Sequence, residues 1–353
     1  MTSSSRALPA SSAPIAIDLF CGSGAVSAAI KANGYRVVAA VDFSAGCERT
    51  YKLNHPEVRF RRRDIRDLRP HELAVAIPAG RHLDLMAVCA PCQPFSSQNR
   101  RRGSHDLRVP LILESVRIAR ALKPRLIIFE NVPGIVGSPI FQDLKRRLAA
   151  AGYTLGNPER VDAADYGVPQ RRVRCIVAAV RGSTVVRDFI GRADRTTGIT
   201  VRQALRGLQP LTSGQSDGRD PLHVSRVHQE ITLRRLAKIP KDGGSRASLP
   251  LDLQLACHRD RNPGDFCDVY GRMRWDDVAP TLTTGCTDVT RGRYAHPEQD
   301  RAITLREAAR LQTFADSYRF VGSKKEIAEQ IGNAVPFEMI RRVVSALRST
   351  YPS

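Results

Sequence analysis

The chain near its start reads Ile15-Ala16-Ile17-Asp18-Leu19-Phe20-Cys21-Gly22-Ser23-Gly24. The apolar run before the glycines predicts a buried strand. The residues from Ala25 to Asn33 predict a helix that Gly34 ends. Glycines between a strand and a helix let the backbone approach a ligand closely at the helix N-terminus. This strand, turn and helix therefore predict a nucleotide-type site in an α/β fold.

Similar patterns recur along the first half of the chain. An amphipathic helix is expected at 111–122, and further strands are expected at 37–41, 83–88, 126–129 and 173–180. Alternating strands and helices favour a mostly parallel sheet with helices on both faces. Near the C-terminus, Thr304 and Glu307 stand at the N-cap and N3 positions of a helix over 305–311, and an amphipathic helix follows Pro336.

The character of the chain changes after residue 181, where short apolar pieces alternate with Arg, Gly, Asp and Thr. We expect a smaller irregular domain over 183–329, a first domain over 14–182 that is completed by 330–353, and a disordered tail over 1–13. The formal net charge is +20, which favours nucleic acid over a membrane surface as the partner. No apolar run approaches the roughly 20 residues that cross a bilayer, and a cytoplasmic location is expected.

A cysteine held between prolines follows the apolar run at 83–88, in Ala90-Pro91-Cys92-Gln93-Pro94. Prolines restrict the backbone on both sides, so the thiol of Cys92 is a candidate nucleophile. Three alternatives remain: a small buried core residue, a redox pair with Cys89, or a zinc ligand. Zinc would require a second ligand pair at matching spacing, and the sequence has none.

Two carboxylates at other strand ends add to this pattern. Asp42 ends the second expected strand, where it can accept hydrogen bonds from ribose hydroxyls. Ser27 stands where a dinucleotide fingerprint needs its third glycine, which favours an adenosyl ligand and disfavours an NAD-dependent oxidoreductase. Glu130 ends the strand at 126–129; such carboxylates are often only solvated, or cap the next helix. Beside a thiol and an adenosyl site, Glu130 indicates covalent activation of an electrophilic ring.

Six blocks occur in an order that resembles the cytosine-5 DNA methyltransferases. The resemblance covers about 15 to 345, and the segment between the fourth and fifth blocks is variable in that family. The blocks are Asp18-Leu19-Phe20-Cys21-Gly22-Ser23-Gly24, Pro91-Cys92-Gln93-Pro94-Phe95-Ser96, Glu130-Asn131-Val132, Gln170-Arg171-Arg172-Val173-Arg174, Arg306-Glu307-Ala308-Ala309-Arg310-Leu311-Gln312-Thr313-Phe314 and Gln330-Ile331-Gly332-Asn333-Ala334-Val335-Pro336.

The resemblance implies a Rossmann-like S-adenosylmethionine methyltransferase domain with a smaller, irregular target-recognition domain. It makes Cys92 the nucleophile that adds to carbon 6 of a flipped-out cytosine, and Glu130 the residue that holds ring nitrogen 3 and the exocyclic amine. Arg172 and Arg174 would lie beside Glu130, with Arg174 contacting the base. The family more often has Glu where this chain has Asp42. The residues implied in S-adenosylmethionine binding are Asp18, Phe20, Gly22, Ser23, Gly24, Asp42, Phe43, Asp64, Ile65, Pro91, Asn333 and Val335.

The implied substrate is duplex DNA, and the enzyme is expected to act as a monomer. A cognate restriction endonuclease is its expected functional partner, without physical association. RNA cytosine methylation and a catalytically silent DNA-binding protein are the alternatives. A second basic run, Arg59 to Arg69, is interpreted as a solvated face. The candidates for DNA contact lie after the nucleophile and in the second domain: Gln93, Ser96, Gln98, Arg100, Arg101, Arg102, Arg272, Arg274, Thr283, Thr284, Arg291 and Arg293.

Overall fold

A computed structural model describes residues 13–91, 110–196, 198–258 and 266–352. Cys92 and the predicted DNA-contacting residues that follow it, Gln93 to Arg102, lie outside the described residues, as does the expected tail apart from Ala13. Within the described part, none of the helices combines the length and apolarity needed to cross a membrane.

The chain divides into two compact units, each made of separate segments. The first unit comprises 1–162, 173–195 and 337–353, and the second comprises 163–172 and 196–336. The expected boundaries therefore differ at three places. Residues 183–195 stay with the first unit because the Arg187 amide donates to Tyr351 and Arg342 donates to the Asp194 carbonyl. Residues 163–172 and 330–336 belong to the second unit, where Arg172 donates to the Gly332 carbonyl.

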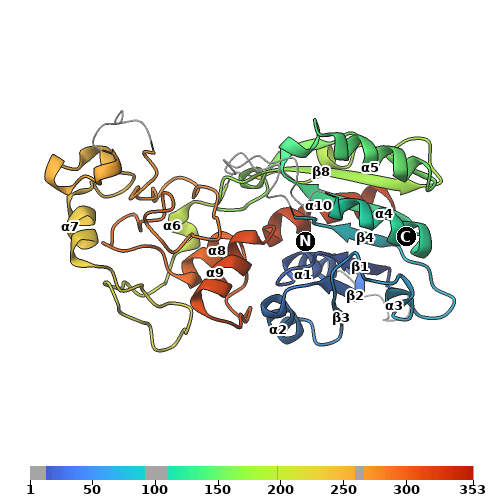
Figure 1. The fold of residues 1–353 in the computed structure, drawn as a ribbon, viewed down its shortest axis with the longest axis horizontal. Coiled ribbons are helices and arrows are strands. Elements are labelled where there is room, and N and C mark those ends of the chain that lie inside the picture. Colours follow the sequence, from blue (N-terminus) through green and yellow to red (C-terminus); the bar gives the residue numbers. More distant parts are fainter. Residues whose placement is uncertain (1–12, 92–109, 197, 259–265, 353) are drawn as a thin grey trace, which may run out of the picture. The chain divides into compact units, whose positions relative to one another are not determined.

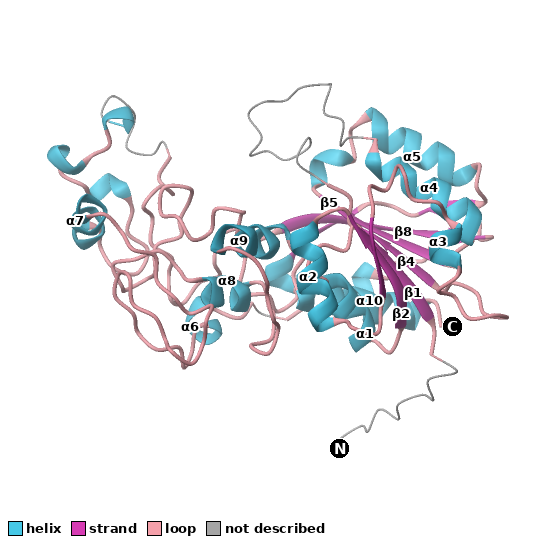
Figure 2. Cartoon of the chain, turned by 60° about the horizontal axis from the view of Figure 1, so that its bottom comes forward, coloured by secondary structure: helices cyan, strands magenta, loops and turns pink. Residues whose placement is uncertain are grey.

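The first unit is built on one twisted sheet (Figures 1 and 2). Among the described residues the strand order is β3-β2-β1-β4-β5-β8-β6, with β7 also paired to β8. The strands β1 to β5 run parallel, whereas β6 and β7 pair antiparallel with β8, which itself runs antiparallel to β5. The strands are β1 Ile15–Leu19, β2 Arg36–Asp42, β3 Arg59–Arg62, β4 Leu85–Val88, β5 Leu126–Asn131, β6 Tyr153–Leu155, β7 Glu159–Asp162 and β8 Val173–Arg181.

Helices cover both faces of this sheet, which confirms the predicted fold class. In Figure 2, α4 and α5 lie on one face and α1 and α10 on the other. Asn33 caps α1 and Gly34 follows with a φ of 77°, so the glycine stands one residue beyond the predicted cap position. The helices of this unit are α1 Ala25–Ala32, α2 Ala45–Asn54, α3 His71–Ala74, α4 Leu111–Leu122, α5 Pro139–Ala149 and α10 Phe337–Thr350.

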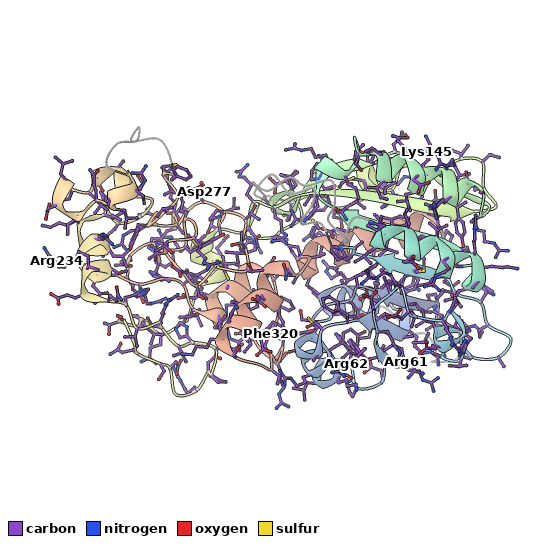
Figure 3. The ribbon with its side chains drawn as sticks, in the orientation of Figure 1. Arg61, Arg62, Lys145, Arg234, Asp277 and Phe320 are labelled. Atoms are coloured by element: carbon purple, nitrogen blue, oxygen red, sulfur yellow. The ribbon has the colours of Figure 1, made fainter. Side chains whose placement is uncertain are left out.

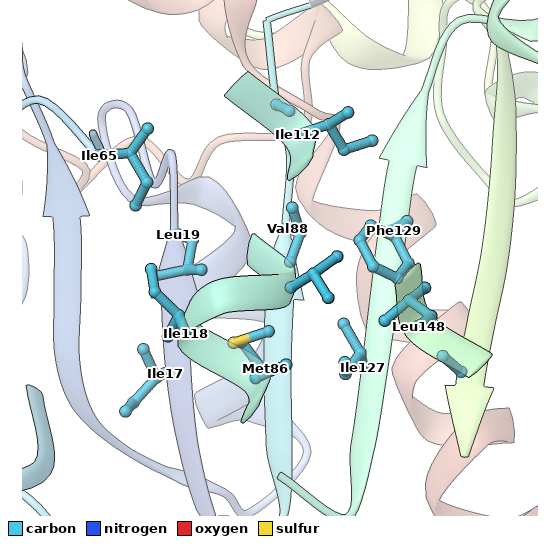
Figure 4. Packing of buried hydrophobic residues seen from close by; sticks show 14 of the residues in the cluster. Ile17, Leu19, Ile65, Met86, Val88, Ile112, Ile118, Ile127, Phe129 and Leu148 are labelled. Atoms are coloured by element: carbon cyan, nitrogen blue, oxygen red, sulfur yellow. The ribbon is translucent and has the colours of Figure 1, made fainter. Parts of the chain in front are cut away.

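Apolar side chains of β1, β4 and β5 pack against α4 and α5 to form the main core (Figure 4). Ile17, Met86 and Ile127 have no exposed surface, and neither does Ile118 of α4. Burial of one such side chain is worth about 1.5–3 kcal/mol. This core holds the strand ends in fixed positions.

The second unit is mostly irregular, as predicted. Its helices are α6 Val201–Ala204, α7 Glu230–Lys238, α8 Leu305–Leu311 and α9 Lys324–Asn333. The predicted capping box of α8 is present: the Thr304 hydroxyl accepts from the Glu307 amide, and the Glu307 carboxylate accepts from the Thr304 amide. Glu307 also pairs with the guanidinium of Arg301, and both side chains are buried.

Candidate active site

The predicted site residues of the first unit follow the carboxyl ends of parallel strands. The chain leaves β1 toward β2 on one side, while β4 lies on the other side, so a topological switch point falls between β1 and β4. Ligands of open α/β sheets bind in the crevice at such a point. The glycine turn follows β1, Asp42 ends β2, and Pro91 follows β4 at this same edge.

Glu130 and Arg174 form an ion pair on neighbouring strands. The Glu130 Oε1 atom lies 2.9 Å from Arg174 Nε, and the two side chains are only 9% and 11% exposed. β5 and β8 pair antiparallel with Glu130 opposite Ile176, which brings Arg174 to the carboxyl end of β5. A charge-assisted bond at such low exposure fixes both groups. The predicted proximity of Glu130 and Arg174 is confirmed.

The next residue, Asn131, connects this strand to the backbone that follows β4. Its side-chain Nδ2 donates to the carbonyl of Ala90 at 3.1 Å, and its Oδ1 accepts from the Val132 amide. Asn131 is buried. It therefore holds the chain two residues before Cys92 against the strand that bears Glu130. Sequence reasoning assigned Asn131 no role, although it lies in the same quoted block as Glu130.

The glycine turn adopts a backbone that few side chains tolerate. Phe20, Gly22 and Gly24 have φ angles of 59°, 52° and 99°, all in the left-handed region. The strain of the non-glycine residue Phe20 is typical of functional sites. The Gly22 amide donates to Asp42 Oδ2 at 3.0 Å, and the Ser44 amide donates to Asp42 Oδ1. Asp42 thus ties the ends of β1 and β2 together, and burial raises its pKa.

Asp18 is a fully buried carboxylate beneath this turn. Its Oδ2 accepts from the Ser27 hydroxyl at 2.7 Å, and that hydroxyl lies 2.6 Å from the Tyr51 hydroxyl. Oδ1 has no hydrogen-bond partner. Burial, together with the charge of Asp42, raises the pKa of Asp18 to about 7, even though the bond from Ser27 lowers it. Ser27, noted in the sequence only as a missing glycine, is in fact the partner of this carboxylate.

We expect Asp18→Asn to remove a pH dependence from the folding stability. The folded state holds the Asp18 proton up to about pH 7, whereas the unfolded chain releases it near 3.8, so the wild type loses stability as pH rises between these values. The loss is on the order of 4 kcal/mol, less whatever relaxation recovers. Urea unfolding at pH 5 and pH 8 should show the part of this fall above pH 5, about 3 kcal/mol, in the wild type and not in Asp18→Asn. Ser27→Ala should extend the fall above pH 7; identical slopes in all three proteins would contradict the assignment.

Arg172 and Arg174 belong to different units. Arg172 belongs to the second unit, where Nη1 donates to the Leu282 carbonyl at 2.9 Å and Nη2 donates to the Gly332 carbonyl at 3.1 Å. The side chain is buried. Its guanidinium thus bridges two backbone segments of its own unit, and its place beside Glu130 as a catalytic group stays a prediction.

Comparison with known proteins identifies the family. The family model for C-5 cytosine-specific DNA methylase matches residues 15–349. The chain belongs to this family. It is 35% identical over 340 residues to the Type II methylase M.HgiDII of Herpetosiphon aurantiacus, covering 94% of each chain. It is 30% identical to the Type II methyltransferase M.XorII of Xanthomonas oryzae, covering 94% of this chain and 83% of the relative.

Solved structures show the same fold. A DNA modification methyltransferase encoded within an E. coli prophage superposes with a TM-score of 0.76 at 24% identity, covering 96% of this chain and 100% of the other. The Dnmt2 methyltransferase of S. pombe gives a TM-score of 0.67 at 16% identity, covering 96% of this chain and 100% of the other. Because the chain belongs to the C-5 cytosine-specific DNA methylase family, this protein is an enzyme, a C-5 cytosine DNA methyltransferase.

The remaining cofactor candidates of the methylase differ in exposure. Phe43, next to Asp42, is 73% exposed. Asp64 accepts from the Arg66 side chain, which lowers its pKa, and it borders a charged cavity of about 540 Å³ with Arg62, Arg63 and Arg69. Ile65 and Ser23 are buried, and Pro91 is half-buried. In the second unit Val335 is buried and Asn333 is exposed.

Burial corrects one of the methylase's predicted DNA contacts, Arg272, whereas the contact of Arg293 stays a prediction. Arg272 is 0% exposed and donates to the carbonyls of Leu236, Ile239, His296 and Gln299 and to Asp300. Arg293 is half-buried and donates to Asp268 and to several carbonyls, including those of Gly243 and Arg272. Both guanidiniums hold the irregular chain together, because buried carbonyls in loops need donors.

The other candidates in the second unit are more accessible. Arg274, Thr284 and Arg291 are exposed. Thr283 is half-buried, and its hydroxyl accepts from Tyr294 and from the Gly285 amide. In the second basic run, Arg62 is exposed and lies near Glu48, and Arg63 is exposed and lies near Glu72. Figure 3 labels Arg61 and Arg62, the last two residues of β3. The exposure of Arg62 and Arg63 agrees with the solvated face predicted there.

Proposed function

We propose that this methylase transfers a methyl group to carbon 5 of a cytosine that has left the base stack of a specific duplex DNA sequence. The observation that carries the proposal is the Glu130–Arg174 pair, because it presents a carboxylate and a guanidinium at the sheet edge where β4 leads into Cys92. Removing a base from the stack costs a few kcal/mol and breaks the hydrogen bonds of its polar edge. A carboxylate and a guanidinium can form new hydrogen bonds with that edge.

In the proposed mechanism the Cys92 thiolate adds to carbon 6 of cytosine, and its electron pair forms the carbon–sulfur bond. Glu130, with Arg174, holds the polar edge of the ring, so that electron density moves to carbon 5 and makes it nucleophilic. After carbon 5 has taken the methyl group, its proton passes to water. The carbon–sulfur bond then breaks and returns the electron pair to Cys92.

The proposed methyl donor is S-adenosylmethionine, and the residues at the glycine turn fit it. A Cβ at Gly22 would meet nothing within 4 Å, so the turn leaves room for a ligand against the backbone. The unpartnered Oδ1 of Asp18 and the exposed ring of Phe43 lie beside this turn and at the end of β2. When bound, the cofactor supplies an electrophilic sulfonium methyl group. Asp18, Phe20, Asp42 and Phe43 would hold it, with Asn333 and Val335 closing the pocket.

The proposed DNA contacts come from two places. The segment Gln93 to Arg102 would meet phosphates, and the exposed residues Arg274, Thr284 and Arg291 would lie in or beside the major groove. The net charge of +20 supports a polyanionic substrate. We propose that the enzyme acts as a monomer and protects the sites of a cognate endonuclease, as the Type II naming of its relatives implies. RNA remains the second candidate substrate.

Bisulfite sequencing tests the proposal. The gene is expressed in cells that lack cytosine methylation, and their DNA is treated and sequenced. We expect cytosines of one short sequence to resist conversion. A parallel assay measures tritium transfer from labelled S-adenosylmethionine to duplex DNA and to tRNA. Transfer to tRNA alone, or full conversion of every cytosine, would overturn the DNA assignment.

A further inference from the structure

A buried polar cluster joins three segments of the second unit. Gln170 and Gln312 are 0% exposed and Arg172 is 4% exposed. Buried polar groups are costly unless they are hydrogen-bonded, so a cluster of this kind has one preferred arrangement. Its members come from the segment before β8, from the residue that follows α8, and, through main-chain carbonyls, from the end of α9.

Arg172 contacts two segments. The residues next to the contact are candidates for DNA binding in one segment and for cofactor binding in the other. Leu282, whose carbonyl accepts from Nη1, precedes the DNA candidates Thr283 and Thr284. Gly332, whose carbonyl accepts from Nη2, precedes the cofactor candidate Asn333. The guanidinium is a planar fork whose donors keep a fixed separation, so it sets the spacing of these two carbonyls.

The same two segments touch directly. A Cβ added at Gly332 would lie 2.4 Å from the carbonyl carbon and oxygen of Thr283. No side chain fits there, and the backbone of α9's last turn rests on the backbone of the DNA candidate segment. A displacement of one segment must therefore move the other.

The two glutamines complete the connection. Gln170 Oε1 accepts from the Leu282 amide at 3.0 Å, and its Nε2 donates to Gln312 Oε1 at 3.0 Å. Gln312 Nε2 in turn donates to the carbonyls of Ile331 and Ala334, on either side of Asn333. Hydrogen bonds thus run without a break from Leu282 to both sides of Asn333.

We propose that Arg172 is a positioning residue that couples DNA recognition to cofactor binding in this methylase. Arg172 fixes the 282–284 segment against the 332–334 segment. The arrangement that favours binding of one ligand therefore also favours binding of the other. The inference rests on the proposed function, which assigns these segments to DNA and to S-adenosylmethionine. Coupling of this kind is reciprocal: each ligand changes the affinity of the other by the same factor.

The test uses the full-length enzyme, S-adenosylhomocysteine as the cofactor probe, and a duplex with the sequence that bisulfite mapping identifies. The dissociation constant of the probe is measured with and without duplex, and kcat and both KM values are measured with S-adenosylmethionine. In the wild type we expect the duplex to tighten probe binding by about tenfold, within the usual range of coupling.

In Arg172→Met we expect the coupling to fall below about twofold and both KM values to rise together, with kcat within about threefold of the wild type. Arg172→Lys should restore part of the coupling, because an ammonium can serve one of the two carbonyls. Arg171→Met, at the exposed neighbouring position, should keep the wild-type coupling. Thermal melting identifies any variant that fails to fold; if Arg172→Met does, the lysine variant decides.

Three outcomes would overturn the inference. A fall in kcat with both KM values and the coupling unchanged would make Arg172 a catalytic residue. A rise in the KM for DNA alone would make it a DNA contact. If the wild type is active but the duplex does not change the affinity for the probe, there is no coupling for Arg172 to provide. Failure of the proposed function is distinct from all three, since the wild type would then transfer no methyl group to DNA.

Discussion

Cys92→Ser is expected to abolish methyl transfer, lowering the single-turnover rate by at least about 10⁴-fold, as loss of a nucleophile commonly does. A serine hydroxyl is far less acidic than a thiol, so almost none of it is present as the anion that attacks carbon 6. Duplex binding should remain within a few-fold of the wild type. The measurement is tritium transfer to duplex DNA at saturating cofactor.

Cys89→Ser is the matched control, because it changes a thiol three positions away. Burial and the charge of Glu130 raise the pKa of Cys89 well above its usual value, so this thiol is not poised to react. The variant should keep most of the transfer activity. If Cys92→Ser stayed active, or if the two variants lost activity equally, the covalent assignment would fall.

Glu130→Gln should be nearly as damaging, and in two measurable ways. The change leaves the guanidinium of Arg174, only 11% exposed, without its charged partner. Breaking a buried pair in this way typically costs 3–5 kcal/mol of folding stability, here at about the lower end because both groups keep some exposure. The single-turnover rate should also fall by about 10²- to 10³-fold, as when a group that stabilises developing charge is lost.

Glu159→Gln serves as the control, since Glu159 is an exposed carboxylate on β7, the strand paired with β8. It should change neither stability nor rate. Adding Arg174→Ala to Glu130→Gln should cost less stability than the two separate changes together, because the pair is already broken. A loss of stability with an unchanged single-turnover rate would make the pair purely structural.

The first half of the fold could be predicted because its signals are local. The helix α4 has the predicted bounds, and β1, the glycine turn and α1 follow the expected order. The edge strand β3 was missed because Arg59-Phe60-Arg61-Arg62 looks like a solvated basic run. Charged residues on an edge strand are in fact a known protection against unwanted pairing. The direction of β8 was not predictable, since an apolar run carries no mark of orientation.

A contact in the candidate site was predictable only where its two residues lie at the ends of neighbouring strands. Glu130 and Arg174 meet because of the β5–β8 pairing, and their motif blocks indicated as much. Arg272 could not be distinguished from Arg274 by sequence, although the first is fully buried and the second is exposed. The difference depends on which distant carbonyls lack donors, here those of Leu236 and His296. No local pattern encodes that.

The division of the chain between Arg172 and Val173 has a consequence for protein engineering. To give a host enzyme a new target sequence, one would join the second unit of another methylase to the first unit of the host. A graft of 196–336 alone would leave the host's Gln170 and Arg172 facing foreign carbonyls. A functional chimera should therefore exchange 163–172 as well. In such a chimera the host supplies both Arg174 and Glu130. The donor methylase supplies Arg172, two positions earlier.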